Sequence, residues 1–207
     1  MEILCIIEKL ADTQVPIADL IARRWSQRAI DPDRLLSREN LLALLEAARW
    51  APSCYGNQPW RYLIWDRFRD PSNWQRAFLC LAEGNQIWVK NAPVLLLSIA
   101  TPSFRHNGQP NRFAQHDTGA ASENISLQAT ALGLVTHQMG GFDADQAMAI
   151  FNIPADHTCM AMIAVGHPAP TEFLPEDLRD KELTSRSREP INSFVFEGSW
   201  DEKFKGL

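Results

Sequence analysis

The sequence predicts an α+β fold, with a central mixed or mainly antiparallel sheet flanked by helices. Segments of helical and strand character are mixed along the chain without strict βαβ alternation, which argues against a Rossmann fold. The run Pro93 to Ala100 (PVLLLSIA) is continuously apolar and has the length of a buried central strand. Neither GxGxxG nor GxxxxGK[ST] occurs, so the usual dinucleotide and nucleotide loops are absent.

Start and stop signals define the elements of the first half. Ser37 can cap a helix whose leucines recur at helical spacing, and Pro52 stops that helix. Pro71 suits the first turn of a later helix. In order, we expect helix 17–24, helix 37–50, strand 61–65, helix 71–83 and strand 93–100.

The second half begins with a polar loop, Thr101 to Arg112, which is long enough to suggest a function or mobility. Gly133 ends a long Ala-, Ser- and Leu-rich helix, Gly140-Gly141 breaks a short strand, and Asp143 can cap the next helix. In order, we expect helix 117–132, strand 134–139, helix 143–151 and strand 159–165.

The tail, from about residue 168 to residue 207, differs in kind from the rest of the single domain that we expect to span 1–207. It is charged and punctuated by prolines, and it carries Phe194-Val195-Phe196 and Trp200 without a core of its own. Such large apolar residues need a surface to cover them. The tail either wraps its own domain or reaches a partner subunit, and we favour the partner.

Composition excludes several classes of function. The chain has 207 residues, 45% of them hydrophobic, and a net charge of −5, so a broad nucleic-acid surface is not expected. No apolar run spans a bilayer, and the N-terminus lacks a basic region and a cleavage site. Four cysteines without paired spacing suggest reduced thiols, and we expect a cytoplasmic protein without membrane association.

Side chains for hydrolytic or metal chemistry are not arranged in any pattern. The five histidines show no helical metal spacing, no HExxH motif occurs, and no GxSxG nucleophile elbow is present. We therefore expect no metal site.

Two basic clusters lie far apart in the chain: Arg23-Arg24-Trp25-Ser26-Gln27-Arg28 and Ser185-Arg186-Ser187-Arg188. Guanidinium groups interleaved with hydroxyls suit a terminal phosphate, although either cluster alone is more often a solvated surface. Gly140-Gly141 is likewise either a plain turn or a place where bare backbone N–H groups approach a ligand.

Taken together, these motifs resemble the nitroreductase family of FMN-dependent oxidoreductases over nearly the whole chain. The resemblance rests on R-x-S-x-R from Arg24, on A-R-W-A-P-S-x-x-x-x-Q-P-W-R from Ala48, on L-Q-A-T-A-L-G-L followed by M-G-G-F-D, and on S-R-x-P in the tail. It implies a homodimer with two FMN sites at the subunit interface and a C-terminal extension that embraces the partner.

The resemblance also implies the cofactor-binding residues. Arg24, Trp25, Ser26 and Arg28 lie in the motif that holds the phosphate and the pyrimidine edge of the flavin, and Arg186 and Arg188 match the phosphate-binding pair of the tail. Gly140 and Gly141 match backbone amides facing flavin N5 and O4, and Asn85 matches an asparagine that hydrogen-bonds the isoalloxazine. Pro52, Ser53 and Cys54 match a loop that closes the site from the other subunit.

The implied chemistry is a ping-pong transfer of hydride from NAD(P)H through flavin N5 to a nitroaromatic, a quinone or an enal. Because the flavin carries this chemistry, no catalytic side chain is expected. The physiological acceptor and the choice between NADH and NADPH are not fixed by the sequence. A flavin-binding sensor or carrier with little turnover is the main alternative.

Two stretches depart from the family pattern. Gly56-Asn57 stands where relatives usually have Asn-Glu. Either the asparagine has moved by one position, or the pair forms a turn without a flavin role, or the smaller residue widens the substrate pocket; we favour the turn. Ser122-Glu123-Asn124 replaces smaller or apolar residues, which leaves the lining of the dimer interface uncertain.

Overall fold

The computed structural model describes residues 7–206. Four strands form one sheet in the order β1-β2-β4-β3, and each neighbouring pair is antiparallel. The strands are β1 (Trp60–Asp66), β2 (Val94–Ala100), β3 (Val135–Met139) and β4 (Thr158–Gly166). The predicted α+β fold is confirmed, with β2 and β4 at the centre of the sheet.

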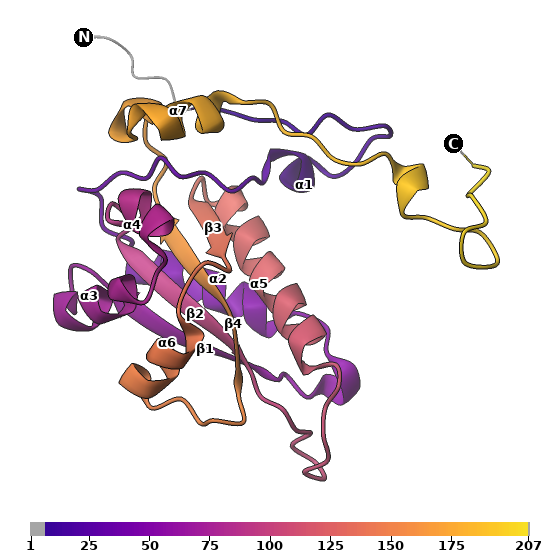
Figure 1. Cartoon of the computed structure of the whole chain (residues 1–207), viewed down its shortest axis with the longest axis horizontal. Helices are drawn as coiled ribbons and strands as arrows, with labels where there is room; N and C mark the ends of the chain where they lie inside the picture. The colour runs from indigo at the N-terminus through magenta and orange to yellow at the C-terminus, as the bar shows by residue number, and fades with distance from the viewer. Residues whose placement is uncertain (1–6, 207) are drawn as a thin grey trace.

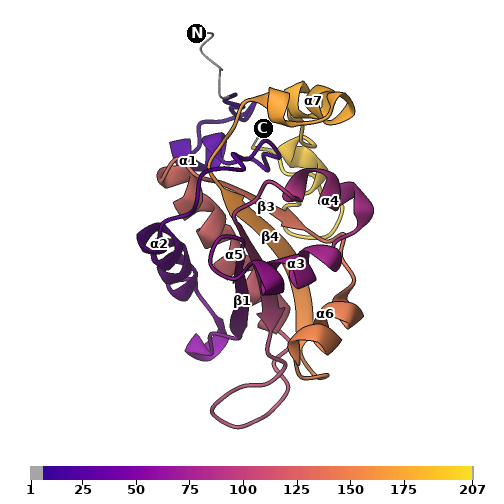
Figure 2. The same cartoon turned by 90° about the vertical axis from the view of Figure 1, so that its left-hand side faces the viewer.

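Helices cover both faces of this sheet (Figures 1 and 2). One face carries α2 (Arg38–Arg49) and α5 (Ala114–Ala131), and the other carries α3 (Pro71–Leu79), α4 (Glu83–Val89) and α6 (Ala144–Phe151). The short α1 (Asp19–Arg23) precedes them, and α7 (Glu176–Leu183) lies in the tail. Three single turns complete the helices: η1 (Cys54–Gly56), η2 (Thr171–Phe173) and η3 (Ile191–Ser193).

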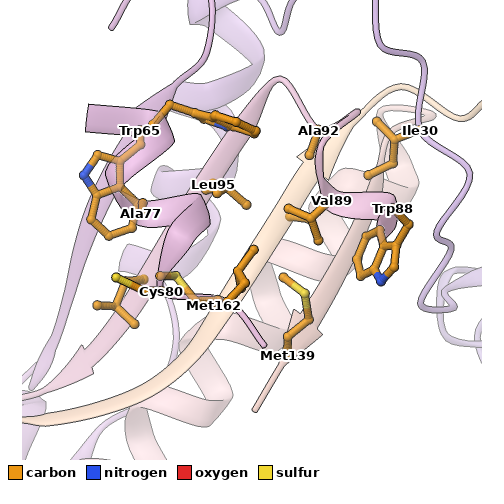
Figure 3. Packing of buried hydrophobic residues seen from close by; sticks show 14 of the residues in the cluster. Ile30, Trp65, Ala77, Cys80, Trp88, Val89, Ala92, Leu95, Met139 and Met162 are labelled. Carbon is orange, nitrogen blue, oxygen red and sulfur yellow. The ribbon is translucent and has the colours of Figure 1, made fainter. Parts of the chain in front are cut away.

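Strand β2 explains why both faces are covered, because all seven of its residues are buried. Val94 and Leu96 pack with α2 and α5, whereas Leu95, Leu97 and Ile99 pack with α3, α4 and α6. Alternate side chains of a strand point to opposite faces, so a continuous apolar strand needs a helical layer on each side. Figure 3 shows the second of these clusters, with Trp65, Trp88 and Met162 filling it.

The predicted capping signals are confirmed. The Ser37 hydroxyl accepts a hydrogen bond from the backbone N–H of Asn40 at 3.1 Å, and Asp143 accepts one from Gln146 at 2.8 Å. Pro71 occupies the first turn of α3. Gly133 follows α5 with φ +66°, a conformation that glycine adopts without steric cost.

The expected helix 71–83 is confirmed as α3, but it ends earlier, at Leu79, and a second helix that the sequence did not predict, α4, begins at Glu83. The chain leaves α3 after Leu79, and its backbone then pairs with the segment that follows β3. Leu81 bridges Phe142, and the N–H of Ala82 donates to the carbonyl of Gly141 at 2.9 Å. This pairing breaks the helix and starts α4, a helix that local propensity does not reveal.

The tail divides into two parts. Leu174 and Leu178, at 2% and 7% exposure, belong to the core of the same chain, and Glu182 is 1% exposed. Farther along, Phe194 and Trp200 stay 64% and 81% exposed, and the last segment extends beyond the body of the domain (Figure 1). The wrapping alternative therefore holds for the stretch around α7, and the later aromatic residues are uncovered within one protomer.

Truncation of one side chain on β2 tests whether the core fills both faces of the sheet. We expect Leu96→Ala to lower the free energy of unfolding by about 2–5 kcal/mol, because the fully buried side chain leaves a cavity between β2 and its helices. Leu42→Ala on α2, where the side chain is 56% exposed, is the control and should cost about 0.5 kcal/mol or less. Equal losses in urea denaturation would contradict this packing.

Candidate functional site

The two basic clusters, separated by more than 150 residues, lie side by side in the fold. Arg186 Nη1 donates to the carbonyl of Arg24 at 2.7 Å, and its Nη2 donates to the carbonyl of Ala22 at 2.5 Å. Burial lowers the pKa of Arg186, and the nearby positive charges of Arg24 and Arg188 lower it further. The fold therefore brings Arg24, Arg186 and Arg188 into one electropositive cluster.

This cluster borders a cavity of about 940 Å³ between the N-terminal segment and the tail. Its lining combines the three arginines and Ser187 with two carboxylates, Asp12 and Glu189, and with apolar side chains that include Ile21, Ile191 and Phe194. An arrangement with cations at one part of the wall and apolar surface at another suits a ligand with an anionic end and an apolar body.

Two guanidinium nitrogens in this cluster are buried without a hydrogen-bond partner, Arg24 Nε and Arg186 Nε. Buried donors are normally satisfied. Arg24 Nε faces Glu123 Oε1 at 3.2 Å, whereas Arg186 Nε has no acceptor among the described residues, so a ligand acceptor suits Arg186. Arg186 uses two of the five guanidinium N–H donors on carbonyls, which leaves the others for an anion. The residues present thus fit a phosphate-bearing ligand.

The polar triplet Ser122-Glu123-Asn124, which departs from the family pattern, has its side chains paired within the chain. Glu123 Oε1 lies 3.2 Å from Arg24 Nε as an ion pair, although this approach lacks hydrogen-bond geometry. Burial raises the pKa of Glu123, and the Arg24 charge opposes that shift. Ser122 bonds the hydroxyl of Tyr62 at 3.1 Å, and Asn124 donates to the carbonyl of Ala47 at 3.0 Å. All three polar residues thus have partners within the protomer.

Arg28, the last predicted residue of the first cluster, is hydrogen-bonded and ion-paired to Glu182 of the tail. Glu182 accepts hydrogen bonds from the backbone N–H groups of Arg28 at 2.7 Å and Ala29 at 3.1 Å, and it forms an ion pair with Arg28 at 3.5 Å. The guanidinium of Arg28 is partly buried, with 30% of its side chain exposed. Sequence patterns gave no indication of Glu182, because its partners lie 153 and 154 residues away.

Trp25 and Ser26 complete the predicted motif. Lys9 Nζ lies 4.7 Å from the centre of the Trp25 ring, a cation–π contact, and donates to the carbonyl of Thr184 at 2.6 Å. Burial is the main reason that the pKa of Lys9 is lowered. Ser26 is exposed, so its hydroxyl is accessible to a ligand.

Asn85 and Gly141, predicted separately, are in direct contact. Asn85 Nδ2 donates to the carbonyl of Gly141 at 2.9 Å. A Cβ on Gly141 would lie 2.8 Å from that same nitrogen, so only glycine admits the contact without a shift. Gly140 and Gly141 are both exposed, which leaves their backbone accessible.

Pro52, Ser53 and Cys54 are not brought to the arginines of their own protomer. Their segment lies at the lower end of α5 in Figure 1, whereas α1 and the tail lie at its upper end. The Cys54 N–H donates to Asp117 Oδ2 at 2.9 Å, and the Ser53 hydroxyl accepts from Gln58 N at 3.0 Å. A role at a flavin site for this segment therefore requires a second subunit.

The Gly56-Asn57 pair has a clear structural use. Gly56 has φ +60°, while Asn57 has the ordinary φ of −66°. Asn57 is only 3% exposed; its amide donates to the carbonyl of Ser103 at 3.3 Å and accepts from the N–H of Arg105 at 2.8 Å. The pair thus fastens the 52–58 loop to the Thr101–Arg112 loop, as a structural role for this turn would require.

His137, a residue not singled out from the sequence, packs behind the first arginine cluster. Its ring lies 4.6 Å from that of Trp88, and Nδ1 lies 3.3 Å from the carbonyl oxygen of Gln27. Burial lowers its pKa to about 4, and the positive charge of Arg28 contributes in the same direction. A neutral histidine here supports the arginine segment without adding another charge to it.

Among residues 7–206, no three His, Cys, Asp or Glu side chains gather as metal ligands do. In the same range, no helix is both long and apolar enough to cross a membrane. Fold and cluster together define an α+β protein with an arginine-lined cavity whose lining suits an anionic, phosphate-bearing ligand.

The family model described as "Nitroreductase family" matches residues 21–167, and the chain belongs to this family. Protein DrgA of Synechocystis is 29% identical over 178 residues, covering 72% of this chain and 82% of that protein. An NADH dehydrogenase of Thermus thermophilus is 29% identical over 170 residues, covering 65% and 80%.

Solved structures share this fold. An oxidoreductase described as containing FMN superposes with a TM-score of 0.85 at 34% identity, covering 93% of this chain and 96% of its own. A Desulfovibrio desulfuricans protein, described as a nitroreductase in complex with FMN, has a TM-score of 0.69 at 28% identity, covering 91% of this chain and 99% of its own.

Removal of the Asn57 side chain should release the loop that it holds. Asn57→Ala deletes both hydrogen bonds to the Thr101–Arg112 loop, and we expect a loss of about 1–3 kcal/mol in unfolding free energy. Hydrogen exchange at Arg105 should also accelerate. Gln109→Ala, an exposed position in the same loop, is the control; unchanged exchange at Arg105 in Asn57→Ala would refute this role.

His137 should make the fold sensitive to acid. Since its folded pKa of about 4 lies below the ordinary 6.5, the unfolded chain binds more protons between these values, and stability falls as pH drops through this window. His137→Gln should lose less stability than the parent between about pH 6.5 and about pH 4. His106→Gln, at an exposed ring, is the control. His167, whose pKa burial also lowers, contributes equally in all three proteins.

Proposed function

We propose that this protein is an FMN-dependent oxidoreductase that takes hydride from NAD(P)H and passes it to an electrophilic acceptor such as a nitroaromatic, a quinone or an enal. The observation that carries the proposal is the convergence of Arg24, Arg186 and Arg188 on one cavity, with the buried Nε of Arg186 lacking a hydrogen-bond partner among residues 7–206. Membership of the nitroreductase family and likeness to two proteins described with FMN support it.

The arginines of this site would hold the phosphate of FMN. Arg24, Arg186 and Arg188 supply charge-assisted donors, the strongest class of hydrogen bond to a phosphate. Ser26 and Arg28 would complete the phosphate contacts and the pyrimidine edge, with Trp25 in the same segment. Because Glu182 and Arg186 fix the backbone of this segment, its donors are oriented before the cofactor arrives.

Asn85, Gly140 and Gly141 would face the flavin ring. Asn85 uses one N–H on the Gly141 carbonyl, and the rest of its amide stays available to the isoalloxazine. The backbone N–H groups of these two exposed glycines would stabilise negative charge on the ring. When bound, FMN supplies hydride transfer at N5, in a ping-pong sequence with NAD(P)H leaving before the acceptor binds, so the chain needs no acid–base residue.

The active form in this proposal is a homodimer, in which each subunit lends Pro52, Ser53 and Cys54 to its partner's flavin. Two features support it. The 52–58 loop lies at the end of α5 away from the arginines of its own protomer, and the tail leaves Phe194 and Trp200 exposed. The tail beyond about residue 186 would cover the partner subunit and bury these rings there.

Loss of either of two arginines should weaken FMN binding. Arg24→Ala and Arg188→Ala each remove charge-assisted contacts, and we expect each to lower FMN affinity by about tenfold or more in fluorescence titrations of the apoprotein. Arg23→Ala is the matched control, because this neighbour of Arg24 pairs with Glu8 and Asp19 instead. Retention of FMN through dialysis by both variants, as in the parent, would show that the site is misassigned.

Steady-state turnover separates an enzyme from a flavin carrier. NADH and NADPH, each tested against quinones, nitroaromatics and aldehydes, should give oxidation of at least one nicotinamide, with parallel double-reciprocal lines for the ping-pong order. A protein that holds FMN yet turns over none of these pairs would instead support a sensor or carrier.

A further inference from the structure

Glu182 is a buried carboxylate for which the proposed flavin chemistry provides no role. It is 1% exposed and lies on α7, in the tail. A buried charge is costly unless it is paired and hydrogen-bonded. All the partners of the Glu182 carboxylate lie in Arg28 and Ala29. Its Oε1 accepts from Arg28 N and Ala29 N, and its Oε2 faces Arg28 Nη1.

Arg186 holds the other end of the same segment, four residues farther along the tail. Its guanidinium donates to the carbonyls of Ala22 and Arg24, while the Glu182 carboxylate accepts from the N–H groups of Arg28 and Ala29. An anion thus takes the free backbone donors and a cation takes the free backbone acceptors. The arginine-bearing segment 22–29 is clamped at both ends by side chains of the tail.

The clamp itself is fixed to the core. Leu178, one helical turn before Glu182, packs in the main hydrophobic cluster at 7% exposure. At the start of α7, Arg179 Nε donates to the carbonyl of Leu174 at 2.7 Å. Glu182 therefore contacts the segment 22–29 from a helix, α7, that is itself packed on the hydrophobic core.

Glu182 also provides negative charge beside a group of cations. Its charge favours the protonated form of Lys9, whereas Arg28 and Arg186 disfavour it, so all four groups lie within electrostatic range. Without this carboxylate, Arg28 would lose its ion-pair partner and face only positive neighbours among these groups. Its guanidinium would then turn toward solvent, because no opposite charge would hold it against α7.

We propose that Glu182 is a positioning residue for cofactor binding, which holds the Arg28 guanidinium and the segment 22–29 in the arrangement that receives the FMN phosphate. This inference rests on the proposed function. It gives the stretch around α7 a role within its own protomer, separate from any contact with a partner subunit.

Glu182→Gln is the informative variant, because the amide oxygen can still accept both backbone N–H groups while the negative charge that pairs with Arg28 is lost. Glu182→Ala would leave those two buried donors unsatisfied, so a loss of FMN affinity could not be separated from a loss of folding stability. The matched control is Asp180→Asn, which removes an exposed carboxylate from the same helix. FMN affinity of each apoprotein is measured by fluorescence titration, and the melting temperature with and without FMN by calorimetry.

For Glu182→Gln we expect FMN affinity to fall by about tenfold, with a smaller rise of the melting temperature on FMN addition. Asp180→Asn should match the parent. In an Arg28→Ala background, Glu182→Gln should cause no further loss, because Glu182 acts through Arg28.

Two results would overturn the inference while the proposed function survives. One is a Glu182→Gln protein that melts lower than the parent but binds FMN equally well, which is a structural role only. The other is a full additional loss of affinity in the Arg28→Ala background. A parent protein that fails to bind FMN at all would instead contradict the proposed function.

Discussion

The hold of the tail on the segment 22–29 is the interaction on which the site depends. Arg24 and Arg28 lie on a stretch that follows a five-residue helix, and five residues make too short a helix to hold a stretch on their own. Glu182 and Arg186 supply the missing constraint from the tail. A site built from both ends of the chain forms only when the whole domain has folded between them.

The sheet and its helices support the segments that meet at the site. Its central strands are buried on both faces, so the sheet and its two helical layers form one close-packed body. His137 on β3 supports the first arginine segment, and the turn after β3 brings Gly141 to Asn85 on α4. Charged groups and bare backbone are thus presented by segments that rest on a rigid core, an arrangement that suits a cofactor whose chemistry needs orientation more than side-chain catalysis.

Much of this could be predicted from the sequence, where local chemistry sets the outcome. Ser37 and Asp143 act as helix caps and β2 is the buried central strand, because each follows from a short pattern. The break between α3 and α4 could not be predicted, since it depends on the pairing of Leu81 with Phe142, which lies 61 residues later in the chain. The roles of Glu182 and Asn57 were not predicted for the same reason. The hydrogen-bond partners of these buried polar side chains lie far away in the sequence, and no spacing rule identifies them.

The central claim is that this arginine cluster binds the phosphate of the cofactor. It is tested most directly by comparing FMN with riboflavin, which carries the same ring without the phosphate, by calorimetric titration of the apoprotein. The account predicts that FMN binds on the order of 100-fold more tightly, since two or more charge-assisted contacts are lost with riboflavin, and that Arg24→Ala narrows this difference. Equal affinity for the two flavins would contradict it.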